Sequence, residues 1–221
     1  MSRKIKTDKG KKATLPIKDD KLLKRVMDYL QIESAHAKSD IKKYQADRNY
    51  MLFLIGFNTA FRAEDLLQLK VKDIEKGYIS IKENKTGKWQ HFRMNKQLHD
   101  DIMEYVNKYN LVSNDYLFMG QKKKETFNGK TRAIIYPITR QNCQKSIFPK
   151  VIKACGIDFK FGLHSLRKTF GYMWYKHGGS LITLQKMYNH YSPEVTLLYV
   201  MWDSEDVEKE REAIYIGKDS K

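Results

Sequence analysis

Residues 164–170 read His-Ser-Leu-Arg-Lys-Thr-Phe, and they begin a segment whose apolar residues recur with a helical period up to Lys176. The spacing places His164 and Arg167 on one face of this predicted helix. Such a pair is more often a surface feature or a satisfied hydrogen bond than a site. The motif therefore acquires meaning only from the segments that accompany it along the chain.

Three further segments belong with this motif when they are taken in chain order. They are residues 61–67 (Phe-Arg-Ala-Glu-Asp-Leu-Leu), Lys85 in a predicted hairpin turn, and Asn-His-Tyr-Ser at 189–192 followed by Tyr199. Each is weak alone, because an arginine at a helix start is usually a surface charge and a tyrosine is usually part of a core. Their order and local structure make the combination informative.

Composition limits the classes of protein to consider. The chain has 221 residues, 41% of them apolar, which suffices for the core of one ordinary domain with short appendages. It carries 42 Lys and Arg against 26 Asp and Glu, a formal net charge of +16. Nucleic acid is the commonest polyanion that such an excess serves; the alternative is a basic protein without this partner.

Signals for several other classes are absent from the sequence. The longest mainly apolar run, residues 51–57, is too short to cross a bilayer, and the N-terminus lacks the apolar region of a secretory signal. The six histidines form no zinc motif and no nucleotide-binding glycine motif is present, so we expect no metal and no cofactor. Cys143 and Cys155 form no disulfide framework, which is typical of a cytoplasmic protein.

The hydrophobic periodicity predicts a mainly α-helical fold with a small antiparallel β-sheet. The first predicted helix begins near Asp19 or Asp20 and includes the apolar residues from Leu22 to Leu30. The other predicted helices cover 40–58, 64–69, 96–108, 140–154, 165–176, 181–188 and 193–201. The predicted strands are 78–81 and 89–94, joined by a turn at 84–88 in which Gly87 is free to take a positive φ. The polar, basic stretch 121–132 is predicted to be a loop.

We expect three parts along the chain. Residues 1–15 form a basic arm with candidate phosphate contacts at Arg3, Lys4 and Lys6, the alternative being a solvated tail. Residues 16–202 are expected to form the main folded domain, which contains the four segments. Residues 203–221 begin with an acidic, helical segment that should face away from DNA; it either contacts a neighbouring subunit or lies on its own domain.

Taken together, the four segments resemble the tyrosine recombinase (phage integrase) family. The first-arginine box of that family corresponds to residues 60–62 (Ala-Phe-Arg) with Asp65, and its hairpin lysine corresponds to Lys85. Its His-x-x-Arg box corresponds to residues 164–167. Its Leu-Gly-His box corresponds to Tyr-Asn-His at 188–190, and its nucleophile corresponds to Tyr199. The resemblance extends over about residues 16–202 and implies the catalytic-domain fold of this family.

The resemblance also implies roles, and the residue types suit them. Cleavage of a phosphodiester without a metal needs a nucleophile, positive charge on the non-bridging oxygens and a proton for the leaving oxygen. By this resemblance, Arg62, Arg167 and His190 bind the phosphate. His164 accepts the proton of the nucleophile, and Lys85 donates a proton to the leaving oxygen. Lys88 competes with Lys85 because it lies in the same turn. Asp65 is expected to orient Arg62.

The implied partner is double-stranded DNA, with self-association on DNA up to a tetramer. Further expected contacts to DNA are Lys88, Lys122, Lys123, Lys124 and Lys168. The chain departs from the family because only about sixty residues precede Arg62, so we expect no separate N-terminal core-binding domain. The resemblance therefore implies a site-specific recombinase that integrates, excises or inverts DNA, while a DNA-binding regulator that does not cut and a type IB topoisomerase remain alternatives.

Overall fold

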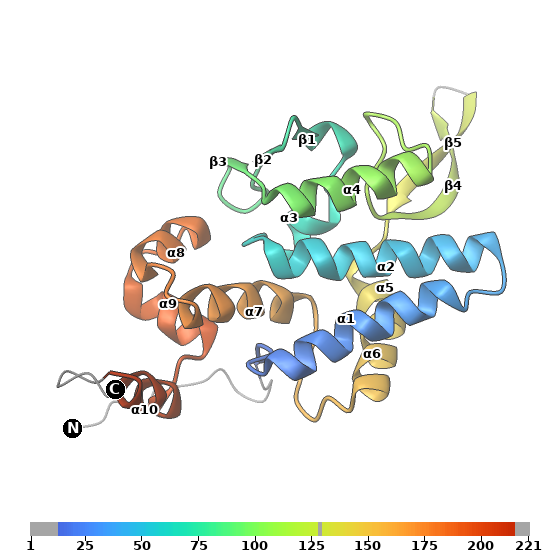
Figure 1. Cartoon of the computed structure of the whole chain (residues 1–221). Helices are drawn as coiled ribbons and strands as arrows, with labels where there is room; N and C mark the ends of the chain where they lie inside the picture. The colour runs from blue at the N-terminus through green and yellow to red at the C-terminus, as the bar shows by residue number, and fades with distance from the viewer. Residues whose placement is uncertain (1–12, 128–129, 215–221) are drawn as a thin grey trace.

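The computed structural model describes residues 13–127 and 130–214, and helices make up most of this part of the chain (Figure 1). The α-helices are α1 (Asp20–Ala35), α2 (Asp40–Asn58), α3 (Ala63–Leu67), α4 (Lys96–Lys108), α5 (Arg140–Asn142), α6 (Phe148–Cys155), α7 (Leu163–Lys176), α8 (Leu181–Tyr188), α9 (Pro193–Val200) and α10 (Ser204–Glu212). A 3-10 turn, η1 (Val71–Asp73), and a π-helical turn, η2 (Cys143–Ile147), complete them. Within these ranges no helix is long and apolar enough to cross a membrane. The predicted fold class is confirmed.

Helix α2 is the centre of the main core, and its apolar stretch at 51–55 is nearly continuous. Leu52, Phe53 and Ile55 are fully buried. The ring of Phe53 packs against that of Phe148 in α6, with centroids 4.9 Å apart. Helices α1 and α7 both pack on α2 (Figure 1). Because α2 is held on most sides, the position of the residues that follow it, including Arg62, is determined by the core.

A three-stranded antiparallel sheet lies beside this core. Its strands, in order, are β1 (Ile74–Glu75), β2 (Tyr78–Lys82) and β3 (Trp89–Arg93). Ile79 and Ile81 are buried and alternate with more exposed neighbours, which is the pattern of a strand with one face on the core. The turn between β2 and β3 contains Gly87 at φ +67°, a conformation that glycine adopts without strain.

The prediction of a loop at 121–132 is wrong. The chain forms a second antiparallel hairpin there, of β4 (Met119–Phe127) and β5 (Lys130–Pro137), in which Lys123 lies opposite Ile134. Its polar composition arises because much of the hairpin is exposed: Lys122, Lys123 and Lys124 are all open to solvent. The dipeptide Asn-Gly at 128–129 is a common hairpin-turn signal and could have revealed this element from sequence.

A smaller core joins α7, α8 and α9. Its buried members are Ala60, Tyr172, Leu184, Tyr188 and Val200. Gly171 allows the close approach of α8 to α7, because a Cβ at this position would stand 2.8 Å from Tyr188 Cζ and closer still to the tyrosine oxygen. The Tyr188 hydroxyl donates to the carbonyl oxygen of Arg167 at 2.5 Å. This core thereby ties the end of α8 to the arginine of the His-x-x-Arg motif.

The first described residues cross α7 rather than standing apart from the domain. Ile17 is fully buried and its amide donates to Thr169 Oγ1 at 2.9 Å. The Leu15 amide donates to the Lys160 carbonyl oxygen at 3.0 Å. The arm expected over residues 1–15 therefore does not extend as far as Leu15. Arg3, Lys4 and Lys6 lie outside the described residues.

Helix α10 packs on its own chain through one buried carboxylate. Asp206 accepts a hydrogen bond from the Tyr172 hydroxyl at 2.6 Å and pairs with Lys18 Nζ at 2.6 Å. Lys18 also contacts Asp203 at 2.7 Å. Burial alone would raise the pKa of Asp206, but the hydrogen bonds from Lys18 and Tyr172 outweigh it and lower the pKa to about 2. The acidic C-terminal segment thus includes a helix anchored at Asp206 and exposed along most of its length.

Removing this carboxylate charge should loosen α10. We expect Asp206→Asn to increase the hydrogen-exchange rate of the α10 amides by about tenfold, because Lys18 and Tyr172 lose their ionised acceptor. Glu208→Gln, on the exposed side of α10, is the matched control and should exchange like wild type. Because the folded-state pKa lies below that of a free carboxylate, this anchoring is present above about pH 4 and is lost toward pH 2. Equal exchange in both variants would contradict the anchoring role.

Candidate active site

Two guanidinium groups meet at the C-terminal end of α8. Arg62, the N-cap residue of α3, donates from Nη2 to the carbonyl oxygen of Tyr188 at 3.2 Å. Arg167, in α7, donates from Nη2 to the same oxygen at 3.0 Å and from Nη1 to the carbonyl oxygen of Ala60. Arg167 is only 3% exposed. The structure therefore brings together the two arginines that the sequence motifs predicted, with one oxygen accepting from both.

Glu83, which the sequence analysis did not identify, is the counter-charge of Arg62. It is buried, and its Oε2 lies 2.7 Å from Arg62 Nη1. Burial disfavours its charged form, but hydrogen bonds from Thr86 and Arg62 outweigh that effect and hold the pKa of Glu83 below its usual value. Glu83 therefore balances the charge of Arg62 and holds its guanidinium in place.

Asp65 does not hold Arg62 as expected. Its Oδ1 accepts from the backbone amide of Asn84 at 2.9 Å, so the carboxylate anchors the start of the β2–β3 turn. Burial raises the pKa of Asp65, and the Asn84 amide only partly offsets this. The physical reason is position: Glu83, directly after β2, reaches the guanidinium, whereas Asp65 reaches the backbone of the next residue.

Lys85 lies in the β2–β3 turn, as predicted, and is exposed. The turn is closed by a bond from the Glu83 amide to the Lys88 carbonyl oxygen and by one from the Gly87 amide to the Glu83 carbonyl oxygen, both 2.9 Å. Over residues 13–127 and 130–214, the structure gives neither lysine side chain a hydrogen bond or an ion pair. Both Lys85 and Lys88 therefore remain candidates for the proton donor.

His164 lies in the first turn of α7 and contacts a residue that the sequence analysis did not consider. Its Nε2 is 2.8 Å from Nη2 of Arg140, the first residue of α5. Burial lowers the pKa of His164, and the positive charge of Arg140 lowers it further. The imidazole is therefore neutral near pH 7. Among the described residues, no hydrogen bond joins His164 to Tyr199.

His190 follows the left-handed C-cap of α8 and packs against Tyr199. Its Nδ1 lies 3.1 Å from Thr196 Oγ1, and its ring centroid is 5.2 Å from that of Tyr199. Burial, with the positive charges of Arg167 and Arg62, lowers the pKa of His190 to about 4. It is therefore a neutral hydrogen-bonding group at neutral pH.

Tyr199 lies in the last turn of α9, close to His190 and Arg167. The Arg167 Cζ atom is 5.8 Å from the centroid of its ring. Burial raises the pKa of Tyr199, although Arg167 and Arg62 act in the opposite direction. The phenol is therefore protonated at neutral pH and must lose its proton when it attacks.

The structure contradicts the expectation that Lys168 is available to DNA. Lys168 is 8% exposed, and its Nζ donates to the Thr14 carbonyl oxygen at 2.8 Å. It also lies 5.2 Å from the centroid of the Tyr199 ring. The reason is its place on α7, where it points under the N-terminal segment. The other lysines expected to contact DNA are exposed: Lys88, Lys122, Lys123 and Lys124.

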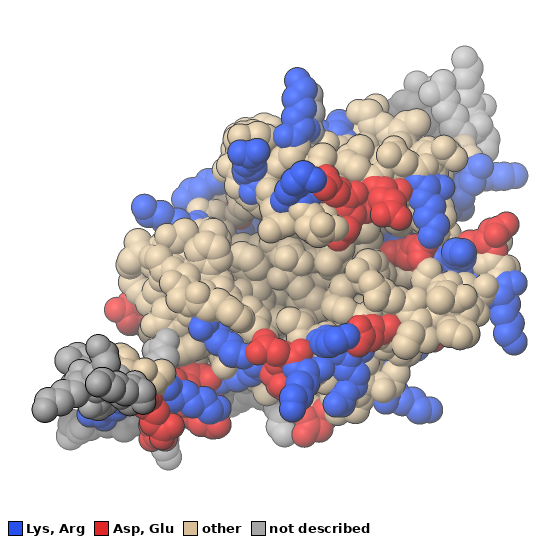
Figure 2. All heavy atoms as spheres, viewed as in Figure 1, with Lys and Arg blue, Asp and Glu red and all other residues tan. Residues whose placement is uncertain are grey.

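Positive charge is not concentrated on the face shown in Figure 2. The Lys and Arg side chains on that face stand around its edge, interleaved with Asp and Glu, and its centre is uncharged. The net charge of +16 therefore does not form a basic patch in the middle of this view.

Asn189 explains why the Tyr-Asn-His box tolerates asparagine where glycine is usual. It is the C-cap of α8 with φ 53° and ψ 40°, a left-handed conformation in which Gly and Asn are the favoured residues. We expect Asn189→Ala to be less stable than Asn189→Gly by about 1 kcal/mol in urea denaturation. The control is Asn142, which has helical angles; there the Ala variant should be the more stable. The same order at both positions would contradict the assignment.

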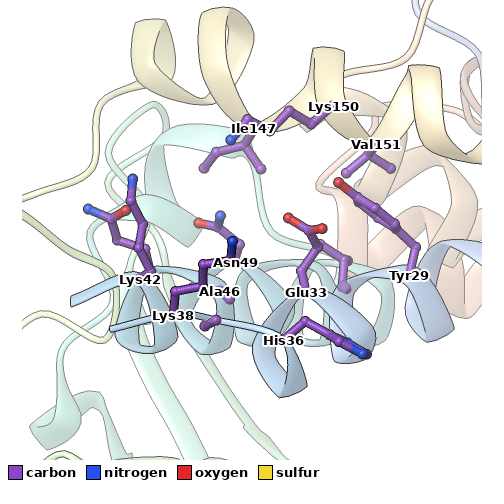
Figure 3. Close-up of a pocket in the computed structure, with 13 residues that line it drawn as sticks. Tyr29, Glu33, His36, Lys38, Lys42, Ala46, Asn49, Ile147, Lys150 and Val151 are labelled. Atoms are coloured by element: carbon purple, nitrogen blue, oxygen red, sulfur yellow. The ribbon is translucent and has the colours of Figure 1, made fainter. Parts of the chain in front are cut away.

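A hollow lies at the other end of α2, away from these residues. It has a volume of about 370 Å³ and lies between α1, α2 and α6 (Figure 3). Tyr29 and Glu33 of α1 face Lys150 and Val151 of α6 across it. No predicted catalytic residue lines it, so the candidate active site is the cluster around Arg62, Arg167 and Tyr199.

The fold and this cluster agree with comparisons to known proteins. The sequence profile described as the phage integrase family matches residues 25–205. The chain is 32% identical over 178 residues to the protein named "Probable integrase/recombinase YoeC" of Bacillus subtilis, covering 79% of this chain and 90% of that protein. The chain therefore belongs to the phage integrase family, whose members are tyrosine-type DNA strand transferases.

Longer relatives match over part of their length. The chain is 25% identical to the tyrosine recombinase XerA of Pyrococcus furiosus over 156 residues, which are 69% of this chain and 49% of that protein. The crystal structure of XerA recombinase superposes with a TM-score of 0.66 at 18% identity, covering 94% of this chain and 66% of that one. XerH bound to its difH substrate in a post-cleavage complex gives 0.65 at 25% identity, covering 91% and 53%. The chain thus spans about half the length of these recombinase sequences.

Proposed function

We propose that this chain cleaves and rejoins DNA strands in site-specific recombination, through a covalent link between Tyr199 and a 3′ phosphate. The observation that carries the proposal is the convergence of Arg62 and Arg167 on one oxygen, beside Tyr199 and His190. Two planar guanidinium groups suit the non-bridging oxygens of a phosphodiester. A tyrosine placed against them is where a nucleophile would be needed.

The proposed step accounts for each bond and each proton. The Tyr199 oxygen forms a bond to phosphorus, and the bond from phosphorus to the 5′ oxygen breaks. His164 accepts the phenolic proton, and Lys85 donates a proton to the departing 5′ oxygen. Arg62, Arg167 and the neutral His190 hold the negative charge that develops on the phosphate, which is usually the largest contribution to catalysis.

The link preserves the energy of the cleaved bond, so rejoining needs neither ATP nor a metal. A 5′-hydroxyl of a second duplex attacks the phosphotyrosine and releases Tyr199. Repetition on four strands, by up to four protomers, gives recombination in which DNA is integrated, excised or inverted. Binding of double-stranded DNA is supported by the complexes that similar recombinase structures form, XerH with difH and the Tn1549 integrase with circular intermediate DNA.

The lysines of the two hairpins would supply part of the contact to the phosphate backbone. Lys88 lies in the first hairpin, and Lys122, Lys123 and Lys124 follow one another in β4 of the second. Affinity for any duplex should therefore fall steeply as salt rises. These contacts position the protein on DNA without reading its bases.

Covalent trapping tests the proposal. The chain is incubated with nicked duplexes tiled from the DNA flanking its gene, so that the short 5′ fragment diffuses away after cleavage. We expect an adduct that survives denaturation, with the modified peptide mapping to Tyr199. Sequence-specific mobility shifts without an adduct would instead indicate a DNA-binding regulator. Relaxation of supercoiled plasmid of any sequence would indicate a topoisomerase.

A further inference from the structure

Arg140 contacts the imidazole of His164 through its guanidinium. Its Nη2 is 2.8 Å from His164 Nε2. The backbone beneath it is fixed, because Ile138 is buried and its amide donates to the Phe118 carbonyl oxygen at 2.8 Å. The Arg140 side chain is 46% exposed. Arg140 therefore has a fixed backbone and a partly exposed side chain, whose guanidinium can change its hydrogen-bond partner.

The contact with Arg140 determines which nitrogen of the neutral His164 imidazole carries the proton. A guanidinium only donates hydrogen bonds, so His164 Nε2 must accept with its lone pair, and the proton of the neutral ring is on Nδ1. While Arg140 holds this lone pair, His164 cannot use it to take a proton from Tyr199. The structure thus shows the candidate base in a blocked arrangement.

Among the residues that the structure describes, the acidic partner of Arg140 is distant and exposed. This partner is Glu64 of α3, at 3.9 Å, and that side chain is 67% exposed. Arg62 differs, because the buried Glu83 lies 2.7 Å from its guanidinium. A phosphate oxygen is a better acceptor for a guanidinium than a neutral imidazole is, because both partners are then charged. An arriving DNA phosphate should therefore draw Arg140 away from His164.

We propose that Arg140 is a third phosphate-binding arginine and a positioning residue for His164: it occupies Nε2 in the free protein and moves to the DNA phosphate on binding, which frees His164 to accept the Tyr199 proton. This inference rests on the proposed function. In this arrangement His164 can accept a proton only when a DNA phosphate is bound at the active site and holds Arg140. Four charged groups face His164: Arg140 from α5, Arg167 and Lys168 from α7, and Glu64 from α3.

The contact itself is tested in the free protein by NMR titration of the histidine side chains, with His164 assigned from the spectrum of His164→Ala. In Arg140→Gln the pKa of His164 should rise toward its ordinary value, because a neighbouring positive charge is removed. Arg211→Gln, an exposed arginine on α10, is the control and should leave the His164 titration unchanged. An unchanged His164 titration in Arg140→Gln would overturn the contact.

The transfer to phosphate is tested with the nicked duplex. Arg140→Gln should lower the second-order rate constant of adduct formation by about 100-fold. It should also shift the acidic limb of the pH profile of this rate constant to higher pH, because the constant reports ionisations of the free protein. It should also reduce the slope of log affinity against log salt by about 0.9. Arg140→Lys keeps the charge and should recover most of the rate.

The outcomes separate this inference from the proposed function. If wild type forms an adduct but Arg140→Gln has the same rate, pH profile and salt slope, Arg140 takes no part and the inference fails alone. If Arg140→Gln loses rate and Arg140→Lys does not restore it, a structural role replaces the one proposed. If wild type forms no adduct, the proposed function fails, and the His164 titration still decides whether Arg140 holds the imidazole.

Discussion

Replacing Tyr199 with phenylalanine is expected to reduce covalent adduct formation by at least about 1000-fold, because the variant lacks the hydroxyl oxygen that forms the bond to phosphorus in the proposed step. Binding of the same duplex should persist. The phenylalanine ring keeps the edge contacts with His190 and Tyr188, whose centroids are 5.2 and 5.3 Å away. The measurement is denaturing electrophoresis of labelled nicked duplex beside a mobility shift on the same samples.

Tyr191 provides the matched control for this experiment. It is a second tyrosine in the same segment, 87% exposed, in the connection between α8 and α9. Tyr191→Phe should form the adduct at the wild-type rate. If Tyr199→Phe still forms the adduct and Tyr191→Phe does not, the nucleophile has been assigned to the wrong tyrosine.

Replacing Gly171 with alanine is expected to lower the free energy of unfolding by about 3 kcal/mol, which is roughly a 6–12 °C decrease in Tm for a chain of this size. The added Cβ would stand 2.7 Å from Val200 Cγ1 and 2.8 Å from Tyr188 Cζ, and a packed core cannot accept it without movement. Adduct formation should fall as well, because the Tyr188 carbonyl oxygen accepts from Arg62 and Arg167.

Gly162 is the control for this substitution. A Cβ at that position would meet only Thr14 Cγ2, at 3.8 Å, and the backbone is extended. Gly162→Ala should therefore change Tm by less than about 2 °C. Combining Gly171→Ala with Tyr188→Phe should restore part of the lost stability by removing the closest atom. Equal Tm values for Gly171→Ala and Gly162→Ala would show that the small core is not packed as described.

The long, strongly periodic elements could be predicted from the sequence with their boundaries. The ranges of α2, α4 and α8 are those that the apolar pattern indicated. The apolar pattern could not predict the β4–β5 hairpin, because an exposed ribbon has no buried face and so no apolar alternation. Its signal in the sequence is the turn dipeptide Asn-Gly at 128–129. Polarity at 121–132 indicated exposure correctly and was mistaken for the absence of structure.

In the candidate active site, too, the sequence predicted some features and not others. The order of Arg62, Lys85, His164, Arg167, His190 and Tyr199 along the chain identified the family, because each residue type suits one part of phosphodiester chemistry. The partners of these residues were not predictable. Glu83 and Arg140 belong to no motif, and they act through ion pairs and hydrogen bonds that form only when α3, α5, α7 and the β2–β3 turn are packed together.

By itself, the sequence determined the fold class, the family and the chemical types at the site, because these depend on local periodicity and on residues in a fixed order. The tertiary structure decided which groups are charged, blocked or buried. Lys168 donates a hydrogen bond to the N-terminal segment, and Asp65 accepts one from the β2–β3 turn instead of from Arg62. Arg140 lies within hydrogen-bond distance of His164 Nε2. Each of these facts depends on a contact between segments far apart in sequence, and no local pattern encodes such a distance.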